Sequence, residues 1–115
     1  MIINHRLHGD RAIVAVSGEV DVFTSPELRE YLQNLIEEGN LNLILDLTGV
    51  EFLDSCGLGV LVGIFHRLQS RDGSLVFAGA SERVGKVFHI TQLTKIFELY
   101  PTLDQALAAG VPTPS

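Results

Sequence analysis

The residues best suited to chemistry in this chain form the run Asp54-Ser55-Cys56-Gly57-Leu58-Gly59. This run lies between a predicted strand and a strongly apolar predicted helix. It places a serine hydroxyl at the start of that helix, where free backbone N–H groups and the helix dipole favour negative charge. The sequence therefore predicts a phosphorylation switch at Ser55. The alternative is an ordinary helix cap, a role for which Asp54 competes with Ser55.

Nucleophilic catalysis is a further hypothesis for the same run. Cys56 is expected to be a small, half-buried hydrophobic residue. A helix N-terminus could lower the pKa of its thiol, but nothing in the sequence places His66 or His89 beside it as a base. We therefore predict no catalytic residue, and an enzyme with Ser55 or Cys56 as nucleophile remains only as an alternative.

Composition and charge restrict the class of protein. The 115 residues suit one domain with a single core, and a hydrophobic content of 46% is typical of a folded chain. A formal net charge of −6 argues against nucleic acid as a partner, because its phosphates would repel the chain. The four histidines show no metal-ligand spacing. No nucleotide-binding or hydrolase motif is present, so no metal or cofactor is predicted.

The compartment follows from the cysteine count and the apolar runs. The single cysteine permits no internal disulfide and suits a reducing compartment. The N-terminus carries no signal-peptide pattern. The longest apolar run, residues 57–65, is far too short to span a bilayer. We expect a cytoplasmic protein without membrane insertion.

The hydrophobic patterns and turn signals predict alternating strands and helices after a first hairpin. Strands are expected at residues 2–7, 12–16, 41–47, 75–78 and 95–100, with Gly18 ending the second and residues 48–53 serving as a connection. Helices are expected at 25–38, 57–69 and 103–109, with a further helix after Ser81. This order predicts an α/β fold with parallel crossovers and one antiparallel pair. The domain is expected to span residues 1–110, followed by a disordered tail at 111–115.

Three helix starts carry capping signals. Thr24-Ser25-Pro26-Glu27 reads as a capping box with Thr24 as the N-cap, although Ser25 followed by Pro26 is an equal alternative. Ser81 is expected to cap the third helix, whose inward residues are Val84, Val87 and Phe88. Thr102 opens a second capping box before the last helix.

The helix after Ser55 has two distinct faces at the 3.6-residue period. Its core face is expected to comprise Leu58, Leu61, Val62, Phe65 and Leu68, with Ile64 at the edge. The opposite face holds Gly59, Gly63, His66, Arg67 and Ser70. Each glycine costs about 0.5–1 kcal/mol relative to alanine within a helix. The two glycines therefore indicate either close packing against another part of this chain or a strip where a partner's backbone approaches.

Two further carboxylates have structural and functional interpretations. Asp21 lies before the first helix, where it could be solvated or accept hydrogen bonds from nearby N–H groups. Asp46 lies late in the central strand and is expected to be satisfied at the strand end. A phospho-accepting receiver domain would also need an acidic pair and a late lysine, and neither is placed convincingly.

Taken together, the segments Gly18-Glu19-Val20-Asp21, 43–47 and 52–60 resemble a bacterial anti-sigma factor antagonist of the STAS domain family. The resemblance covers residues 2–109. It implies a STAS-type single domain, with a mixed β-sheet and helices packed mainly on one side. It also implies that Asp21 lies near Ser55 and contributes to the binding surface.

The resemblance further implies a partner-switching mechanism. The unphosphorylated antagonist binds an anti-sigma factor that is a serine kinase carrying its own ATP, and a sigma factor is released. Phosphorylation of Ser55 by that kinase breaks the complex, and a PP2C-type phosphatase resets it. The expected partner-binding residues are Asp21, Asp54, Ser55, Cys56, Gly57, Gly59 and Gly63. Cys56 occupies a position where the family commonly has Ser or Thr, which removes an alternative acceptor.

A second function remains open within the same family. The chain could be a STAS adaptor subunit of a stressosome-like or lipid-transport assembly. In that case binding would be constitutive, and phosphorylation would be modulatory or absent.

Overall fold

A mixed five-stranded sheet forms the centre of the molecule, with its strands in the chain order β1-β2-β3-β4-β5. The strands are β1 (Ile2–His8), β2 (Arg11–Val20), β3 (Asn42–Leu53), β4 (Ser74–Ala78) and β5 (Glu98–Tyr100). β1 and β2 are antiparallel, and the other neighbouring pairs are parallel, as predicted. This computed structural model describes residues 1–112; residues 113–115 of the expected tail lie outside the described residues.

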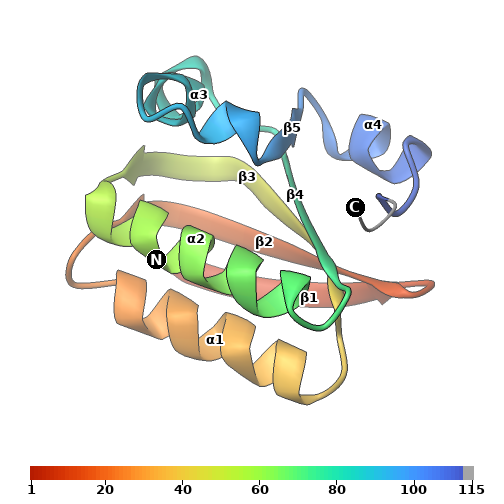
Figure 1. Ribbon diagram of the computed structural model, residues 1–115. Helices are drawn as coiled ribbons and strands as arrows, with labels where there is room; N and C mark the ends of the chain where they lie inside the picture. The colour runs from red at the N-terminus through yellow and green to blue at the C-terminus, as the bar shows by residue number, and fades with distance from the viewer. Residues whose placement is uncertain (113–115) are drawn as a thin grey trace.

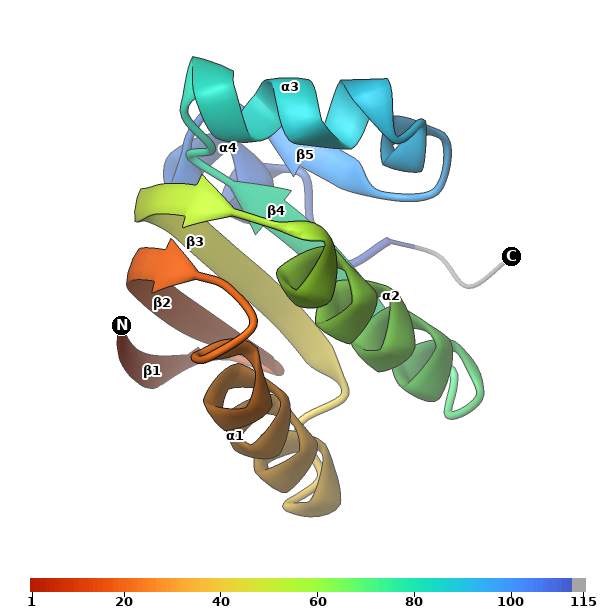
Figure 2. The same ribbon diagram turned by 90° about the vertical axis from the view of Figure 1, so that its left-hand side faces the viewer.

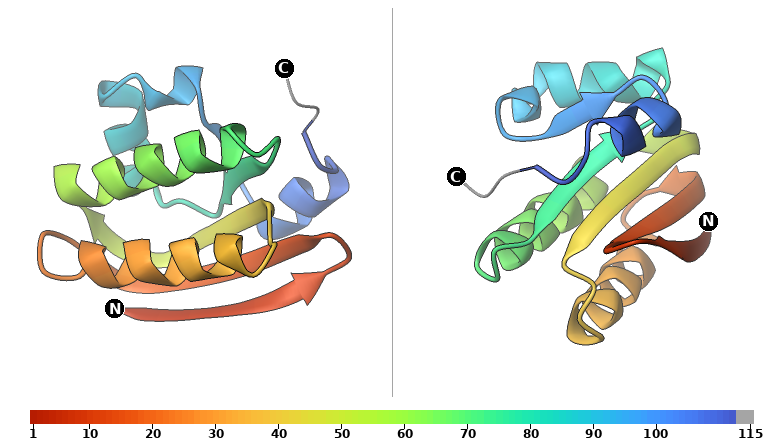
Figure 3. Two further views of the ribbon diagram at one scale, coloured as in Figure 1. Left: turned by 60° about the horizontal axis from the view of Figure 1, so that its bottom comes forward. Right: turned by 90° about the vertical axis from the view of Figure 1, so that its right-hand side faces the viewer.

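Three helices cover one face of the sheet, and a fourth lies on the other face (Figure 1). The covering helices are α1 (Ser25–Glu37), α2 (Ser55–Gln69) and α3 (Glu82–Ile90), whereas α4 (Leu103–Ala108) packs on the opposite face. A 3-10 turn, η1 (Leu93–Lys95), precedes β5. The expected STAS-type arrangement, with helices mainly on one side, is confirmed. Figure 3 shows that α1 and α2 run side by side along the sheet.

The strands are apolar on both faces because both faces are covered. The buried strand residues point alternately to the two faces of the sheet. On one face they join a large cluster under α1, α2 and α3, and on the other a small cluster under α4. The large cluster includes Val14, Leu45 and Phe77 of the strands with Leu32, Leu61 and Phe88 of the three helices. The small cluster joins α4 to the sheet through Ala106, Ile13, Ile44, Val76 and Ala78.

Two strands are longer than predicted, and one is shorter. β2 continues past Gly18 to Val20, and β3 continues through residues 48–53, where a connection was expected. Gly18 (φ +95°) and two register shifts between β2 and β3 allow these two strands to bend and remain hydrogen-bonded to each other. β5 begins only at Glu98, because residues 93–95 form η1 after Gln92 turns the chain with φ +62°.

The side-chain caps match the prediction at two of these three helix starts. Ser81 and Thr102 accept hydrogen bonds from the N–H groups of Val84 and Gln105 and cap α3 and α4. The expected capping box at Thr24 is wrong. Thr24 precedes α1, but its hydroxyl faces backward, accepting from Asp21 N at 2.9 Å and donating to the Glu19 carbonyl at 2.8 Å.

The two faces of α2 lie nearly as the helical period predicts. Leu58, Leu61, Ile64 and Leu68 are buried, and the glycine-bearing face is exposed throughout. Val60 is also buried, which the prediction missed, while Val62 and Phe65 are only partly buried. The difference arises because α2 packs against α1 as well as against the sheet (Figure 2). Val60 and Ile64 are buried on the side of α2 that faces α1.

Arg11 of β2 joins α4 to the sheet by hydrogen bonds. Its guanidinium donates to the carbonyls of Ala106 and Leu107, each at 3.2 Å, and the residue is buried. These carbonyls lie at the C-terminal end of α4, where a positive charge is favourable.

We expect Arg11→Met to destabilise the domain by about 1–3 kcal/mol, because two carbonyls would lose a charged donor in a buried site. Urea unfolding of both forms measures this difference. Arg6→Met on the exposed strand β1 is the matched control and should change the free energy of unfolding by less than about 0.5 kcal/mol. An equal loss in both variants would contradict a specific role for Arg11.

Candidate functional site at the carboxyl edge of the sheet

The helix cap of α2 is Asp54 and not Ser55. The Asp54 backbone is extended, and its Oδ1 accepts hydrogen bonds from the N–H groups of Cys56 (2.9 Å) and Gly57 (3.0 Å). The helix therefore begins at Ser55, two residues earlier than predicted. Ser55 is exposed, and within residues 1–112 its hydroxyl forms no hydrogen bond. Capping by Asp54 leaves the serine hydroxyl available for chemistry.

Parallel pairing of β2 and β3 brings the loops around Asp21 and Ser55 together. Val20 is paired with Leu53, and Asp54 N donates to the Val20 carbonyl at 3.1 Å. Asp21 directly follows Val20, and Ser55 directly follows Asp54. The carboxyl ends of neighbouring parallel strands thus place both residues at one edge of the sheet, as the family resemblance implied.

Gly57 sets how closely α2 approaches this edge. It is buried, and a Cβ there would lie 2.6 Å from Leu53 Cδ1, 2.8 Å from Val20 Cγ1 and 3.2 Å from the Val20 carbonyl oxygen. Only glycine lets the first turn of α2 rest directly on the ends of the two strands. Among the predicted partner-binding residues, Gly57 is therefore the one whose structural role is internal packing.

Asp21 organises the loop between β2 and α1. Its Oδ1 accepts hydrogen bonds from Thr24 N at 3.0 Å and Phe23 N at 2.9 Å. These bonds, the Thr24 N–H first among them, lower the pKa of the Asp21 carboxyl below its usual value. Asp21 therefore stays ionised near neutral pH and places a negative charge at the same edge of the sheet as Ser55. The expectation that it accepts from nearby N–H groups is confirmed.

Cys56 is exposed, so the prediction of a half-buried residue is wrong. It lies on the side of the first turn of α2 that faces away from the sheet.

In residues 1–112, no group of three His, Cys, Asp or Glu side chains could hold a metal ion. Asp46 accepts hydrogen bonds from the backbone and hydroxyl of Thr48, at 3.1 and 2.6 Å, and is satisfied. It lies within β3 and not at the strand end as expected, because the strand continues to Leu53.

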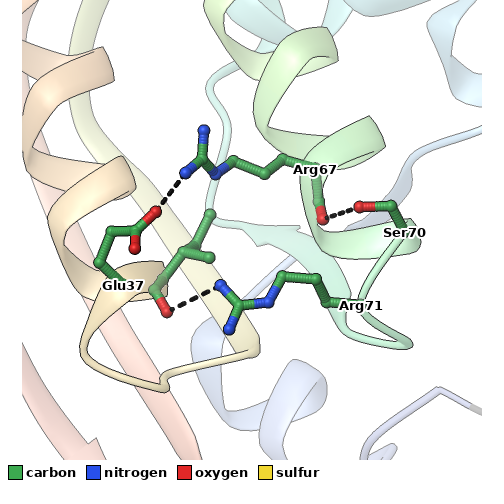
Figure 4. Close-up of polar contacts among 5 residues, drawn as sticks. Glu37, Arg67, Ser70 and Arg71 are labelled. Carbon is green, nitrogen blue, oxygen red and sulfur yellow. Dashed lines mark hydrogen bonds and ion pairs between the residues drawn. The ribbon is translucent and has the colours of Figure 1, made fainter.

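Gly59 and Gly63 form an open strip on α2. A Cβ at either position would meet nothing within 4 Å, so close packing against another described part of the chain does not explain them. Both line a shallow groove between α1 and α2, together with Arg29, Gln33 and Arg67. Arg67, which lines the groove, forms an ion pair with Glu37 of α1. Figure 4 shows this ion pair.

Two apolar residues of this edge were not singled out from the sequence. Val22 and Phe23 follow Asp21, and their exposed fractions are 55% and 87%. The available signal was an apolar pair in a loop between a strand and a helix start.

No helix within residues 1–112 combines the length and the apolar character needed to cross a membrane.

A mixed sheet with three helices on one face, and an Asp-Ser helix start at its carboxyl edge, defines a STAS-type domain. Residues 3–106 match the model of the STAS domain family, and the chain belongs to this family.

Several anti-sigma factor antagonists are similar to this chain. The anti-sigma-B factor antagonist of Staphylococcus epidermidis is 40% identical over 92 residues, which cover 80% of this chain and 85% of the relative. The protein of that name from Listeria monocytogenes serovar 1/2a is 40% identical over 90 residues, 78% of this chain and 79% of the relative. A crystal structure of an anti-sigma factor antagonist from Mycobacterium paratuberculosis superposes with a TM-score of 0.87 at 33% identity, covering 94% and 92% of the two chains.

A more distant structural neighbour shares the fold alone. Unphosphorylated SpoIIAA, an anti-sigma factor antagonist, has a TM-score of 0.74 at 17% identity and covers 94% of this chain and 96% of its own.

The glycines of α2 give a test of the site's geometry. We expect Gly57→Ala to lower the free energy of unfolding, because overpacking costs about 1–3 kcal/mol and exceeds the gain in helix propensity. Gly59→Ala should instead raise it by about 0.5–1 kcal/mol, because the added methyl group enters open space. Urea unfolding of the two variants measures both signs. Two changes of the same sign would contradict the packing difference described for these positions.

Proposed function

We propose that this chain is a cytoplasmic anti-sigma factor antagonist that works by partner switching. Its unphosphorylated form binds an anti-sigma factor serine kinase and thereby releases a sigma factor, and phosphorylation of Ser55 ends the binding. The observation that carries this proposal is the exposed Ser55 hydroxyl, which Asp54 leaves free by capping α2. The names of the relatives at 40% identity support the class of function.

A phosphate on Ser55 would act on the interface and leave the fold intact. It adds about −1.5 to −2 charges at pH 7. The N-terminus of α2 offsets part of this charge inside the domain. At an interface the phosphate would lose water and meet the ionised Asp21 nearby, which is costly. Reducing a complex from 99% to 1% occupancy takes about 5.5 kcal/mol, which one buried phosphate can supply.

The chain acts in this scheme as a substrate and a binding module, and not as an enzyme. The kinase carries the ATP, and a PP2C-type phosphatase removes the phosphate from Ser55. Because Cys56 follows the serine, the first turn of α2 offers a single hydroxyl acceptor. The proposed partner surface comprises Asp21, Asp54, Ser55, Cys56, Gly59 and Gly63, with Gly57 beneath it as the contact between α2 and the sheet.

Incubation with ATP and the candidate anti-sigma factor kinases of the same organism tests the switch. We expect one added phosphate by intact mass, and none on Ser55→Ala. The phosphorylated form should bind the kinase about 10⁴-fold more weakly. It should melt within a few degrees of the unmodified form, since Ser55 is exposed.

Two outcomes would contradict the switch. Binding to a kinase without any phosphate transfer would favour the constitutive adaptor within the same family. A phosphorylated form that unfolds would show that Ser55 acts through stability and not through the interface.

The glycine strip yields a separate prediction. Gly63→Arg should weaken binding to the kinase at least about tenfold, because a long side chain would stand where the partner's backbone approaches. Its circular dichroism spectrum should be unchanged, since nothing of this chain lies within 4 Å of the new Cβ. Ala108→Arg, on the exposed side of α4, adds the same charge on the opposite face and should bind normally. Unfolding of Gly63→Arg would contradict this assignment.

A further inference from the structure

We propose that Val22 and Phe23 form an apolar anchor that inserts into a pocket of the anti-sigma factor kinase. This inference rests on the proposed function and adds to it an apolar hot-spot contact with the kinase. Phe23 exposes 87% of its surface, the largest fraction among the exposed large hydrophobic residues of the described chain, and Val22 exposes 55%. Neither side chain is part of the core clusters of the domain.

Local hydrogen bonds hold the loop that carries Phe23 in one conformation. The Phe23 N–H donates to Asp21 Oδ1 at 2.9 Å, and the next N–H, of Thr24, donates to the same oxygen at 3.0 Å. Ser25 N donates to the Asp21 carbonyl at 2.8 Å, and the Thr24 hydroxyl donates to the Glu19 carbonyl. An aromatic side chain on such a backbone loses little conformational entropy on binding. Rigid, exposed aromatic residues are typical of the few positions that dominate interface energies.

The position of the anchor makes it continuous with the Ser55 site. Val22 and Phe23 directly follow Asp21, which the pairing of Val20 with Leu53 holds at the edge where α2 begins. A partner that covers Ser55 therefore meets the anchor as well. A phosphate would then have to be desolvated beside an apolar contact, which explains how one modification could disrupt the whole interface.

The charges around the anchor favour a protein partner over two other occupants. An anionic membrane surface would be repelled by the ionised Asp21 beside Phe23 and by the net charge of −6. A second copy of this chain would bring two Asp21 carboxylates together. A kinase pocket with an apolar floor and a basic rim satisfies both the aromatic ring and the carboxylate.

The test compares Phe23→Ala with Leu7→Ala in binding to the kinase that phosphorylates Ser55. Leu7 is similarly apolar and 66% exposed, but it is paired with Ala12 at the opposite edge of the sheet. We expect Phe23→Ala to raise Kd about 30-fold or more, as at an interface hot spot, and Leu7→Ala to leave Kd within about twofold. Both variants should melt like the wild type, because both side chains are exposed.

The outcomes separate this inference from the proposed function. If the wild type binds and is phosphorylated while Phe23→Ala binds within about twofold of it, the anchor is wrong and the proposed function stands. If no kinase binds or modifies the wild type, both are wrong. A Phe23→Ala variant that loses only sedimentation with anionic lipid vesicles, or only self-association, would overturn the kinase as the occupant.

Discussion

The candidate site depends on how the parallel pair β2–β3 ends, where Asp54 N donates a hydrogen bond to the Val20 carbonyl. This hydrogen bond keeps the two strands together until the chain turns, so that the loops around Asp21 and Ser55 leave the sheet side by side. Gly57 lets α2 rest against this last pair, because any Cβ would overlap Val20 and Leu53. Every feature assigned to the candidate site, including the exposed Phe23, is placed by this junction.

At this junction the structural and functional roles fall on different residues. Asp54 accepts the helix N–H groups that a capping Ser55 would have taken, and Asp21 accepts those of its own loop. Both carboxylates therefore stabilise backbone geometry, while the Ser55 hydroxyl remains free. A phosphate could be added to such a hydroxyl without replacing any bond that the fold needs.

Much of this arrangement could be predicted from the sequence because it depends on local patterns. The apolar strands, the exposed glycine face of α2 and the caps at Ser81 and Thr102 follow from periodicity and side-chain chemistry. The extension of β3 through residues 48–53 could not be predicted, because its polar residues look like a loop and only pairing with β2 keeps them extended. Thr24 failed as a cap for a similar reason, since Asp21 and Glu19 engage its hydroxyl. Likewise, the exposure of Cys56 depends on where α2 meets the sheet.

The two edges of the sheet differ in what a change there would affect. At the edge where β2 begins, the buried Arg11 forms hydrogen bonds with α4, which join distant parts of the chain. The carboxyl edge carries exposed groups whose hydrogen bonds are mostly local, within five residues along the chain. The proposed partner switching would need this separation, because a modification that breaks an interface must leave the core unchanged if the reaction is to be reversed. A site built on local bonds over a shared junction meets that requirement, since the charge at Ser55 can change while the packing at Gly57 does not.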